Sequence, residues 1–458
     1  MTSNLSFLFA FAATLAAILF MAWGGKTKAL DGIDFSLGGR KAGRWNVFGA
    51  ITGTLVGGAS TIGTAQLAFL YGLSAWWFTL GAGLACLFLA LFLAVPLRNS
   101  QVETIPQFIA RYHGNRARIA ASLFTALGMF VQIVAQMLAC GAILATLFGL
   151  ELFWSAALSA LLIILFTLGG GMKAAGLTGL IKMGLIYLTM IVAGFWALTL
   201  SGGWRELREV FPAFPWFSLF GYGVGEGLSD LLSMVIGVIS TQTYLQAIFS
   251  ARDATTARSG ALLSAILIPP LGLLGILVGL YMRSTQPELK SALALPTFII
   301  ETLPSGLAGI AFATLLIAAV GTASGLALGV ATTLKTDVIR QPWSSSRYEL
   351  TFFRGLTSAI VLAAFVLLLF NLGSAIMDWS FLSMGLRGAT LCIPLLFAVF
   401  LGSSRLRRAG ALSIFIAPTC VVATGIVKMS SIPPLYFGLG ISLLLFTGGL
   451  LFSRRNQR

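Results

Sequence analysis

The stretch AITGTLVGGASTIGTAQ, residues 50–66, combines glycines and hydroxyl side chains inside a long apolar segment. Where a membrane helix unwinds, its freed carbonyls and nearby hydroxyls can coordinate a cation or a polar solute. Small residues also let neighbouring helices pack closely. This stretch alone leaves both interpretations open. The residues concerned are Gly53, Gly57, Gly58 and Gly63, with the hydroxyls of Thr52, Thr54, Ser60, Thr61 and Thr64.

A second interrupted segment favours the binding interpretation. Residues 219–248 are apolar, broken by glycines, and carry Glu226, Asp230, Thr241, Gln242 and Gln246. In transporters built from inverted repeats, a pair of broken helices marks the binding site near the middle of the membrane. The two segments therefore predict one shared site.

Arg387 is the one basic residue near the middle of an apolar span. A charge at the bilayer centre is costly, so it must face a partner or a watery cavity. Its planar guanidinium suits bidentate recognition of a substrate carboxylate. It could also replace a missing cation, form an ion pair with Asp378 or Asp230, or reach a lipid interface.

The elements that must position these residues are membrane helices. The chain is 58% hydrophobic and 9% charged, with a mean hydropathy of +0.95, which excludes a water-soluble globular protein of this size. Apolar runs long enough to cross a bilayer of about 30 Å recur along the whole sequence. The sequence predicts an all-α polytopic membrane protein of about thirteen helices, at 5–23, 45–70, 74–96, 117–148, 152–169, 175–200, 219–248, 259–282, 305–334, 353–373, 376–401, 409–428 and 434–453.

The distribution of charge predicts the orientation. If the N-terminus lies outside and the C-terminus in the cytoplasm, most of the 29 basic residues fall on the loops that face the cytoplasm. Lys173 and Lys182 are counted in one of these loops. The first apolar run has no basic residue before it and is read as a true span rather than a signal peptide. The net charge of +15 therefore faces lipid head groups and does not indicate nucleic-acid binding.

The sequence offers little for catalysis or a transition-metal site. Its four cysteines are scattered through apolar spans, and the lone His113 is placed in a cytoplasmic loop. No long loop could form a soluble catalytic domain. We expect a protein that is not an enzyme and has no cofactor.

Five motifs resemble the sodium:solute symporter family. They are SLGGRKAG (36–43), ETIPQFIARYHGNRARIAA (103–121), TLGGGMKAAGLTGLIK (167–182), TQTYLQAIFSARDATTARSGAL (241–262) and AAVGTASGLALGVATTLKTDVI (318–339). The resemblance implies a LeuT-like fold, a 5+5 inverted repeat with broken first and sixth core helices. The implied divisions are an extra helix at 1–24, repeats at 45–201 and 219–401, and two peripheral helices at 409–453.

The resemblance also implies a sodium site. Its carbonyls and hydroxyls would come from Gly53, Val56, Ala318, Gly321 and Thr322. The sequence departs from the family at two points, because Gly321 replaces a hydroxyl and Gly179 follows Thr178 where an Asp is frequent. The resemblance implies sodium as the coupling ion. Because both changes remove cation ligands, a proton or no coupling ion remain as the alternatives.

The solute pocket that the resemblance implies draws on the first, second, third and sixth core helices, and the buried charge of Arg387 adds that residue to it. The glutamines could instead form hydrogen bonds between helices. Glu226 and Asp230 are expected in an outer vestibule. The pocket residues are Ser60, Thr61, Thr79, Gln132, Gln136, Met234, Gly237, Val238, Gln242 and Arg387.

The expected function is cation-coupled import of a small polar solute, an amino acid or organic acid, by alternating access in the plasma (inner) membrane. A sodium-independent carrier or exchanger and a transporter-like solute sensor are the alternatives. The lipid bilayer and a small molecule are the expected partners, and the sequence does not indicate the oligomeric state.

Overall fold

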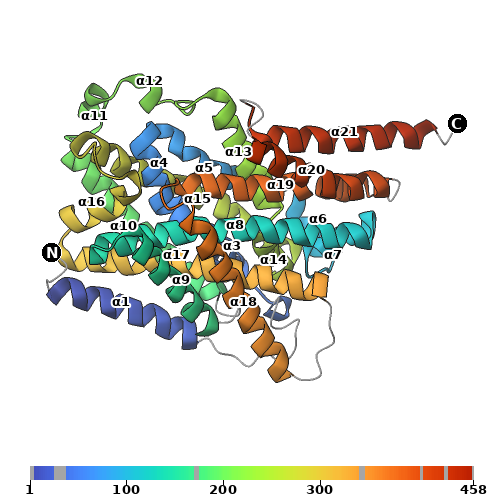
Figure 1. Ribbon diagram of the computed structural model, residues 1–458, viewed down its shortest axis with the longest axis horizontal. Helices are drawn as coiled ribbons and strands as arrows, with labels where there is room; N and C mark the ends of the chain where they lie inside the picture. Colours follow the sequence, from blue (N-terminus) through green and yellow to red (C-terminus); the bar gives the residue numbers. More distant parts are fainter. Residues whose placement is uncertain are drawn as a thin grey trace.

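The computed structural model describes residues 5–24, 38–169, 175–339, 346–402, 406–427 and 432–455. These residues form helices and no β-strand. Most of the long helices run roughly parallel to one another (Figure 1). The fold is therefore the all-α bundle that the sequence predicts.

Each predicted apolar range coincides with a helix or with consecutive helices. By length and apolarity, nine helices among the described residues could cross a membrane, or ten if one bent pair is a single span. The count of thirteen stays a prediction. The elements are α1 (Leu5–Gly24), α3 (Arg44–Leu55), α4 (Thr64–Tyr71), α5 (Trp77–Phe88), α6 (Ala94–Asn99), α7 (Ile105–His113), α8 (Asn115–Phe148), α9 (Leu152–Gly169), α10 (Ala175–Leu200), α11 (Trp204–Val210), α12 (Ala213–Trp216), α13 (Val224–Ile239), α14 (Gln242–Ser250), α15 (Ala254–Thr285), α16 (Ala294–Thr302), α17 (Ser305–Thr333), α18 (Ser346–Leu369), α19 (Ile376–Leu401), α20 (Arg407–Val427) and α21 (Pro434–Arg455).

The first predicted break is present between α3 and α4. The helix ends at Leu55, Val56 has extended backbone angles, and a π-helical turn leads into α4. The main-chain N–H groups freed by the break are not left bare. Gly57 donates to the Ser60 hydroxyl at 2.9 Å, and Gly58 donates to the side-chain oxygen of Gln136 at 2.8 Å. Side chains thus replace the missing helical hydrogen bonds, as an interior helix break in a membrane requires.

The second predicted break separates α13 from α14. The two helices meet at an angle of 41°. Ser240 and Thr241 lie between them, and Thr241 has extended backbone angles. The sixth core helix is therefore broken, as the resemblance implies.

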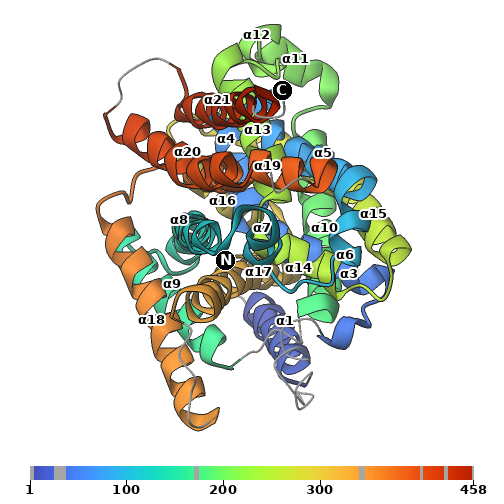
Figure 2. The ribbon, with the colours of Figure 1, turned by 90° about the vertical axis from the view of Figure 1, so that its right-hand side faces the viewer.

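The two long central helices, α8 and α17, form the core of the bundle. In their most apolar windows, 83% of α8 and 78% of α17 is buried, against 22% to 33% for α18, α20 and α21. Figure 2 shows α18 and α1 at the periphery of the bundle. The core helices surround the two breaks, and the peripheral ones present apolar surface outward.

The two ends of the chain lie at opposite ends of the bundle. α1 starts at the end where α11, α12 and α16 lie, and α21 finishes at the other end (Figure 1). An odd number of crossings would give this arrangement.

Candidate cation and solute site

The Lys182 amino group lies at the predicted cation site. Its Nζ donates to the main-chain oxygen of Gly53 at 2.7 Å and to the Thr322 hydroxyl at 2.8 Å. Lys182 is 8% exposed. Its predicted place in a cytoplasmic loop is wrong, because the residue lies within α10 and faces the break in the first core helix. Two of the five predicted sodium positions are thus joined by a side chain of the protein itself.

Close packing of α10 on α3 brings Lys182 to this position. A Cβ at Gly179 would overlap the main-chain oxygen of Gly49 and lie 3.3 Å from the Cα of Gly53. Residues three apart share a helix face, so Gly179 and Lys182 both face α3. This close packing leaves no space at position 179 for the Asp that is frequent in the family that the sequence resembles. It permits the approach that lets Lys182 reach the Gly53 carbonyl.

Of the other predicted sodium ligands, two are not bonded to Lys182, and Gly321 has no side-chain oxygen to offer. Val56 and Ala318 are fully buried, and no hydrogen bond of either to Lys182 is present. At Gly321 a Cβ would have only Phe166 nearby, at 3.9 Å, so a hydroxyl side chain could be accommodated there but is missing. A hard cation needs several oxygens. This donor set, already bonded to an amine, does not fit a bound sodium ion.

The predicted pocket residues of the first core helix form hydrogen bonds to the unwound backbone of the same helix. Ser60 and Thr61 both donate to the main-chain oxygen of Gly57, each at 3.0 Å. They are buried and support the unwound segment. In this conformation their hydroxyl protons are engaged by the backbone.

Four other predicted pocket residues lie at helix–helix contacts. Thr79 of α5 packs against Gly272 of α15 so closely that a Cβ at position 272 would overlap the Thr79 hydroxyl. Met234 packs against α5, and Gly237 allows α13 to approach α19 near Met384. Val238 is fully buried. These positions shape the core in this conformation.

The two glutamines of α8 have different roles. Gln136 accepts from Gly58 and therefore supports the break in the first core helix. Gln132 donates to the Ser380 hydroxyl at 3.0 Å, while its side-chain oxygen is buried without a hydrogen-bond partner. Gln132 thus retains an unused polar atom in the interior.

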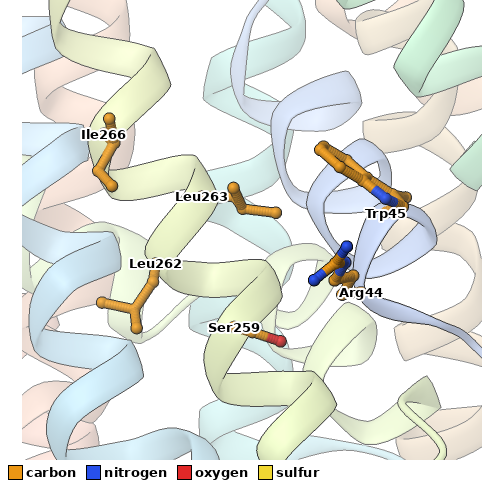
Figure 3. A pocket seen from close by; sticks show the side chains of 6 residues that line it. All are labelled: Arg44, Trp45, Ser259, Leu262, Leu263 and Ile266. Carbon is orange, nitrogen blue, oxygen red and sulfur yellow. The ribbon is translucent and has the colours of Figure 1, made fainter.

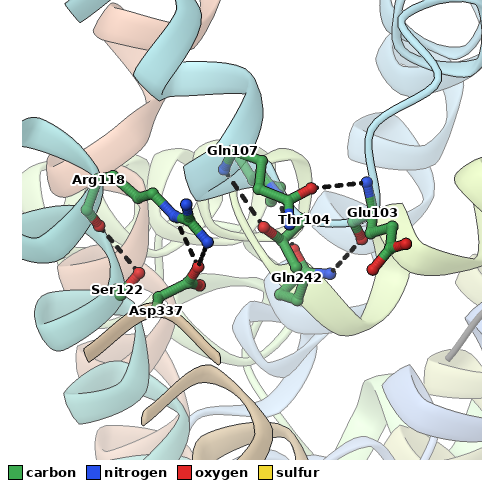
Figure 4. A network of polar contacts seen from close by, with 8 residues as sticks. Glu103, Thr104, Gln107, Arg118, Ser122, Gln242 and Asp337 are labelled. Atoms are coloured by element: carbon green, nitrogen blue, oxygen red, sulfur yellow. Dashed lines mark hydrogen bonds and ion pairs between the residues drawn. The ribbon is translucent and has the colours of Figure 1, made fainter. Parts of the chain in front are cut away.

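Gln242 connects α14 to the segment before α7 (Figure 4). Its side-chain oxygen accepts from the Ile105 amide at 2.8 Å, and its amide nitrogen donates to the Glu103 carbonyl at 3.1 Å. Both ends of the side chain are engaged by main chain. In the same view Arg118 pairs with the buried Asp337 at 2.8 Å. This end of the bundle is held by polar contacts, and Gln242 belongs to them.

Arg387 is fully buried in α19 beside the second break. Its guanidinium donates to the Thr241 hydroxyl at 2.9 Å and to the Ser383 hydroxyl at 2.6 Å. Its stem lies against Gly128 of α8. Neither Asp378 nor Asp230 forms an ion pair with it in the part of the chain that the structure describes. A guanidinium at zero exposure also does not reach the lipid interface.

Lys182 and Arg387 occupy comparable places. Each lies on a long helix, α10 or α19, that packs on a broken helix, α3 or α13 respectively. Each side chain reaches the break at the C-terminal end of that helix: Lys182 bonds to the Gly53 carbonyl, and Arg387 bonds to the Thr241 hydroxyl. A cation is favourable there because the helix dipole is negative at its C-terminal end. Arg387 was predicted from the sequence as a site residue, whereas Lys182 was not.

Unused polar atoms gather around the second break. Ser240 and Thr243, which lie at the break between α13 and α14, have buried hydroxyls without a hydrogen-bond partner. An unsatisfied buried polar atom is costly and needs a reason. With Arg387 and Thr241, these atoms define the polar centre of the bundle.

The expected vestibule residues lie near the α11–α12 end. Tyr222 donates to the Asp230 carboxylate at 2.5 Å. Burial and the neighbouring Asp230 raise the pKa of Tyr222 above its ordinary value. The phenol therefore stays protonated and continues to donate.

A recess elsewhere on the molecule is lined by none of the predicted site residues. It lies between the start of α3 and α15 (Figure 3). The lining residues are Arg44, Trp45, Ser259, Leu262, Leu263 and Ile266. No cluster of metal-ligating side chains was found among the described residues either.

Known proteins resemble this chain in both sequence and fold. Residues 35–417 match the model of the sodium:solute symporter family. The uncharacterized symporter YwcA of Bacillus subtilis (strain 168) is 25% identical over 390 residues, which cover 81% of this chain and 75% of YwcA. The high affinity choline transporter 1 of Homo sapiens is 25% identical over 257 residues, covering 55% of this chain and 44% of that transporter. A solved structure of a Na+-coupled sialic acid symporter superposes with a TM-score of 0.79 at 16% identity, covering 98% of each chain.

Proposed function

Because the chain belongs to the sodium:solute symporter family, we propose that it is a symporter for a small solute that carries a carboxylate. The family is one of transporters and not of enzymes, and the fold is that of a Na+-coupled symporter. Cation-coupled transport across a membrane is therefore the general function. The chemical class of the solute is the part that we infer from the site.

The observation that carries this proposal is the environment of Arg387. The side chain is fully buried, and its bonds go to neutral hydroxyls, the Met384 sulfur and main chain. No acidic partner forms an ion pair with it among the described residues. A buried charge without a counter-charge is destabilising unless something compensates it. A solute carboxylate would supply that charge through a bidentate pair.

The unused polar atoms near Arg387 support the same assignment. Ser240 and Thr243 offer two hydroxyls at the second break, and Gln132 of α8, which donates to Ser380 of α19, retains an unused side-chain oxygen. A polar solute that reaches Arg387 could satisfy them together. We place the solute at the junction of α8, the α13–α14 break and α19. Arg387 and Gln132 would then contact the solute, rather than the predicted residues Thr79 and Met234.

The relatives differ in the charge of what they carry. Choline is a quaternary ammonium, and the human relative is named for it. Sialic acid has a carboxylate, and the structural neighbour is a symporter of it. Two buried basic side chains near the breaks would repel a cationic solute. We therefore favour an acid or an amino acid over choline.

Transport would proceed by alternating access. The repeats at 45–201 and 219–401 each begin with a broken helix, and they would rock against each other around the site. α1 and the helices within 409–453 would form the periphery. We place the N-terminus outside and the C-terminus in the cytoplasm of a cell that carries this protein in its plasma membrane, which agrees with the basic residues on alternate loops.

The test is uptake of labelled amino acids, organic acids and choline into proteoliposomes. We expect saturable uptake of one carboxylate-bearing solute, and binding of that solute that weakens at least tenfold in Arg387→Gln, because a charge-assisted hydrogen bond contributes about 1.5–3 kcal/mol. The matched control is Arg258→Gln, which changes an Arg in α15 that the site does not include. Uptake of choline alone, or equal affinity in both variants, would contradict the proposal.

A further inference from the structure

We propose that the recess between α3 and α15 binds a membrane phospholipid with an anionic head group. The phosphate lies against Arg44, and an acyl chain runs along Leu263 and Ile266. The recess includes neither Arg387 nor Lys182, so the proposal does not depend on the proposed solute or on its coupling ion.

The recess exists because α3 and α15 pack closely at one point. A Cβ at Gly260 would lie 2.6 Å from the Val47 side chain and 3.1 Å from the main-chain oxygen of Arg44. Larger side chains flank this contact and leave the space beside it unfilled (Figure 3). Those from α15 are three, four and seven residues apart and therefore share one helix face. They are Ser259, Leu262, Leu263 and Ile266.

The rim of the recess faces the lipid. Only 44% of the most apolar window of α15 is buried inside the protein, so much of this helix presents apolar surface outward. Ile266 is 68% exposed, and Trp45 is 50% exposed. Tryptophan is typical of the level at which the head groups meet the hydrocarbon. An acyl chain is therefore the apolar partner that this surface meets.

The length of α15 sets the depth of the recess. Its 32 residues span about 48 Å, whereas the hydrocarbon layer is about 30 Å thick. With the helix centred, roughly 9 Å at each end extends into the head-group region, which corresponds to about six residues. Ser259, the sixth residue of α15, then lies at the boundary, and Ile266 lies roughly 10 Å deeper. The recess thus begins among the head groups and ends among the acyl chains.

The charge of the recess matches this order. Among the six described residues that line it, Arg44 is the one with a charge. Figure 3 shows Arg44 and Ser259 toward one end and Ile266 at the other. The Ser259 hydroxyl already donates to the Thr256 carbonyl at 3.1 Å, so Arg44 is the charged donor that remains. A basic end and an apolar end are the two parts that an anionic phospholipid requires.

The Arg44 guanidinium is held in position for an anion. It lies 5.5 Å from the centroid of the Trp45 ring, within the range of a cation–π interaction. No acidic side chain forms an ion pair with Arg44 in the ranges that the structure describes. The planar guanidinium can donate two parallel hydrogen bonds to a phosphate. A free phosphate would use Arg44 alone, whereas a phospholipid also covers the apolar side chains beyond it.

The first experiment measures lipid binding through thermal unfolding of the purified, delipidated full chain. Phosphatidylglycerol and phosphatidylcholine with the same acyl chains are added in about 0.5 M KCl, which screens long-range attraction between surface charges. A ligand that binds only the folded state raises its stability by RT ln(1 + [L]/Kd). We expect a larger rise in unfolding temperature with phosphatidylglycerol. Equal rises with the two lipids would overturn the proposal.

Arg44→Gln locates the head group. We expect the Kd for phosphatidylglycerol to increase at least tenfold, because a hydrogen bond to a charged group contributes about 1.5–3 kcal/mol. The matched control is Arg258→Gln, which removes an exposed Arg next to Ser259 on the same helix but outside the recess. We expect its Kd to stay close to that of the natural protein. Equal losses in the two variants, or no loss in Arg44→Gln, would refute the site.

Two further arms distinguish a phospholipid from a free anion. Inorganic phosphate has the charge without the chains, and we expect it to give no rise that depends on Arg44. A rise as large as that with phosphatidylglycerol would overturn the assignment to a lipid. Ile266→Ser changes the apolar end and should weaken phosphatidylglycerol binding, whereas Leu444→Ser of α21, at a position 71% exposed, should not. Equal binding in these two variants would contradict the proposal even if Arg44→Gln failed to fold.

Discussion

The contact between Gly179 and α3 gives a quantitative prediction. A Cβ at position 179 would overlap the Gly49 oxygen and lie 2.8 Å from the Gly49 carbonyl carbon. Non-bonded carbons prefer about 3.5–4.0 Å, so Gly179→Ala must separate α10 and α3 by roughly 1 Å. The 2.7 Å bond from Lys182 to the Gly53 oxygen would then stretch beyond hydrogen-bonding range.

The expected cost can be worked from this separation. Overpacking of a tight contact costs about 1–3 kcal/mol. Replacing a helical Gly with Ala gains up to about 1 kcal/mol, which offsets part of that cost. Gly184→Ala in the same helix makes the same change where no atom lies within 4 Å of the new Cβ. The difference between the two variants therefore isolates the packing contribution.

The assay is unfolding of both variants in the same detergent. We expect Gly179→Ala to be less stable than Gly184→Ala by about 1–3 kcal/mol. We also expect reduced uptake in Gly179→Ala alone. Equal stability and equal uptake in the two variants would refute the claim that Gly179 sets the distance between α10 and α3.

Three further predictions concern other buried polar contacts. Gln136→Leu leaves the Gly58 N–H without its acceptor and should lower stability by about 1–3 kcal/mol, whereas Gln136→Glu keeps an acceptor; thermal unfolding compares them. Arg118→Ala leaves the buried carboxylate of Asp337 without its arginine and should cost about 3 kcal/mol by the same measurement. Burial lowers the pKa of His113 below its ordinary value of 6.5, so the unfolded chain binds more protons and stability should fall as the pH drops below that value, by at most about 1.4 kcal/mol per pH unit. His113→Gln should remove this fall.

Each of these predictions has an outcome that contradicts it. Equal unfolding temperatures for Gln136→Leu and Gln136→Glu would mean that the Gly58 bond contributes nothing. An Arg118→Ala variant as stable as the natural chain would mean that Asp337 does not depend on this partner. A fall in stability at low pH that persists unchanged in His113→Gln would assign it to other groups.

Much of the fold could be predicted from the sequence because it depends on local signals. Apolar runs of membrane length gave the helices, and the glycines with hydroxyls at 50–66 gave the first break. The second break was predicted from the same kind of interruption at 219–248. Both signals lie within one segment of the chain, so no knowledge of neighbouring helices was needed.

The site was harder to predict because its contacts join distant segments. Lys182 resembled a basic loop residue, and only the packing of α10 on α3 shows that it reaches Gly53. Gln242 looked like a pocket residue, but its amide is engaged by main chain near α7. Burial of Arg387 was foreseeable from its place in a span, whereas its neutral partners were not.

The measurement that tests the account most directly is accumulation of a labelled carboxylate in proteoliposomes under one gradient at a time. The account predicts accumulation of one carboxylate-bearing solute under an inward gradient of its coupling cation, and no accumulation of choline under the same gradient. Accumulation of choline and of no carboxylate would contradict it, since Arg387 would then not face the charge of the solute.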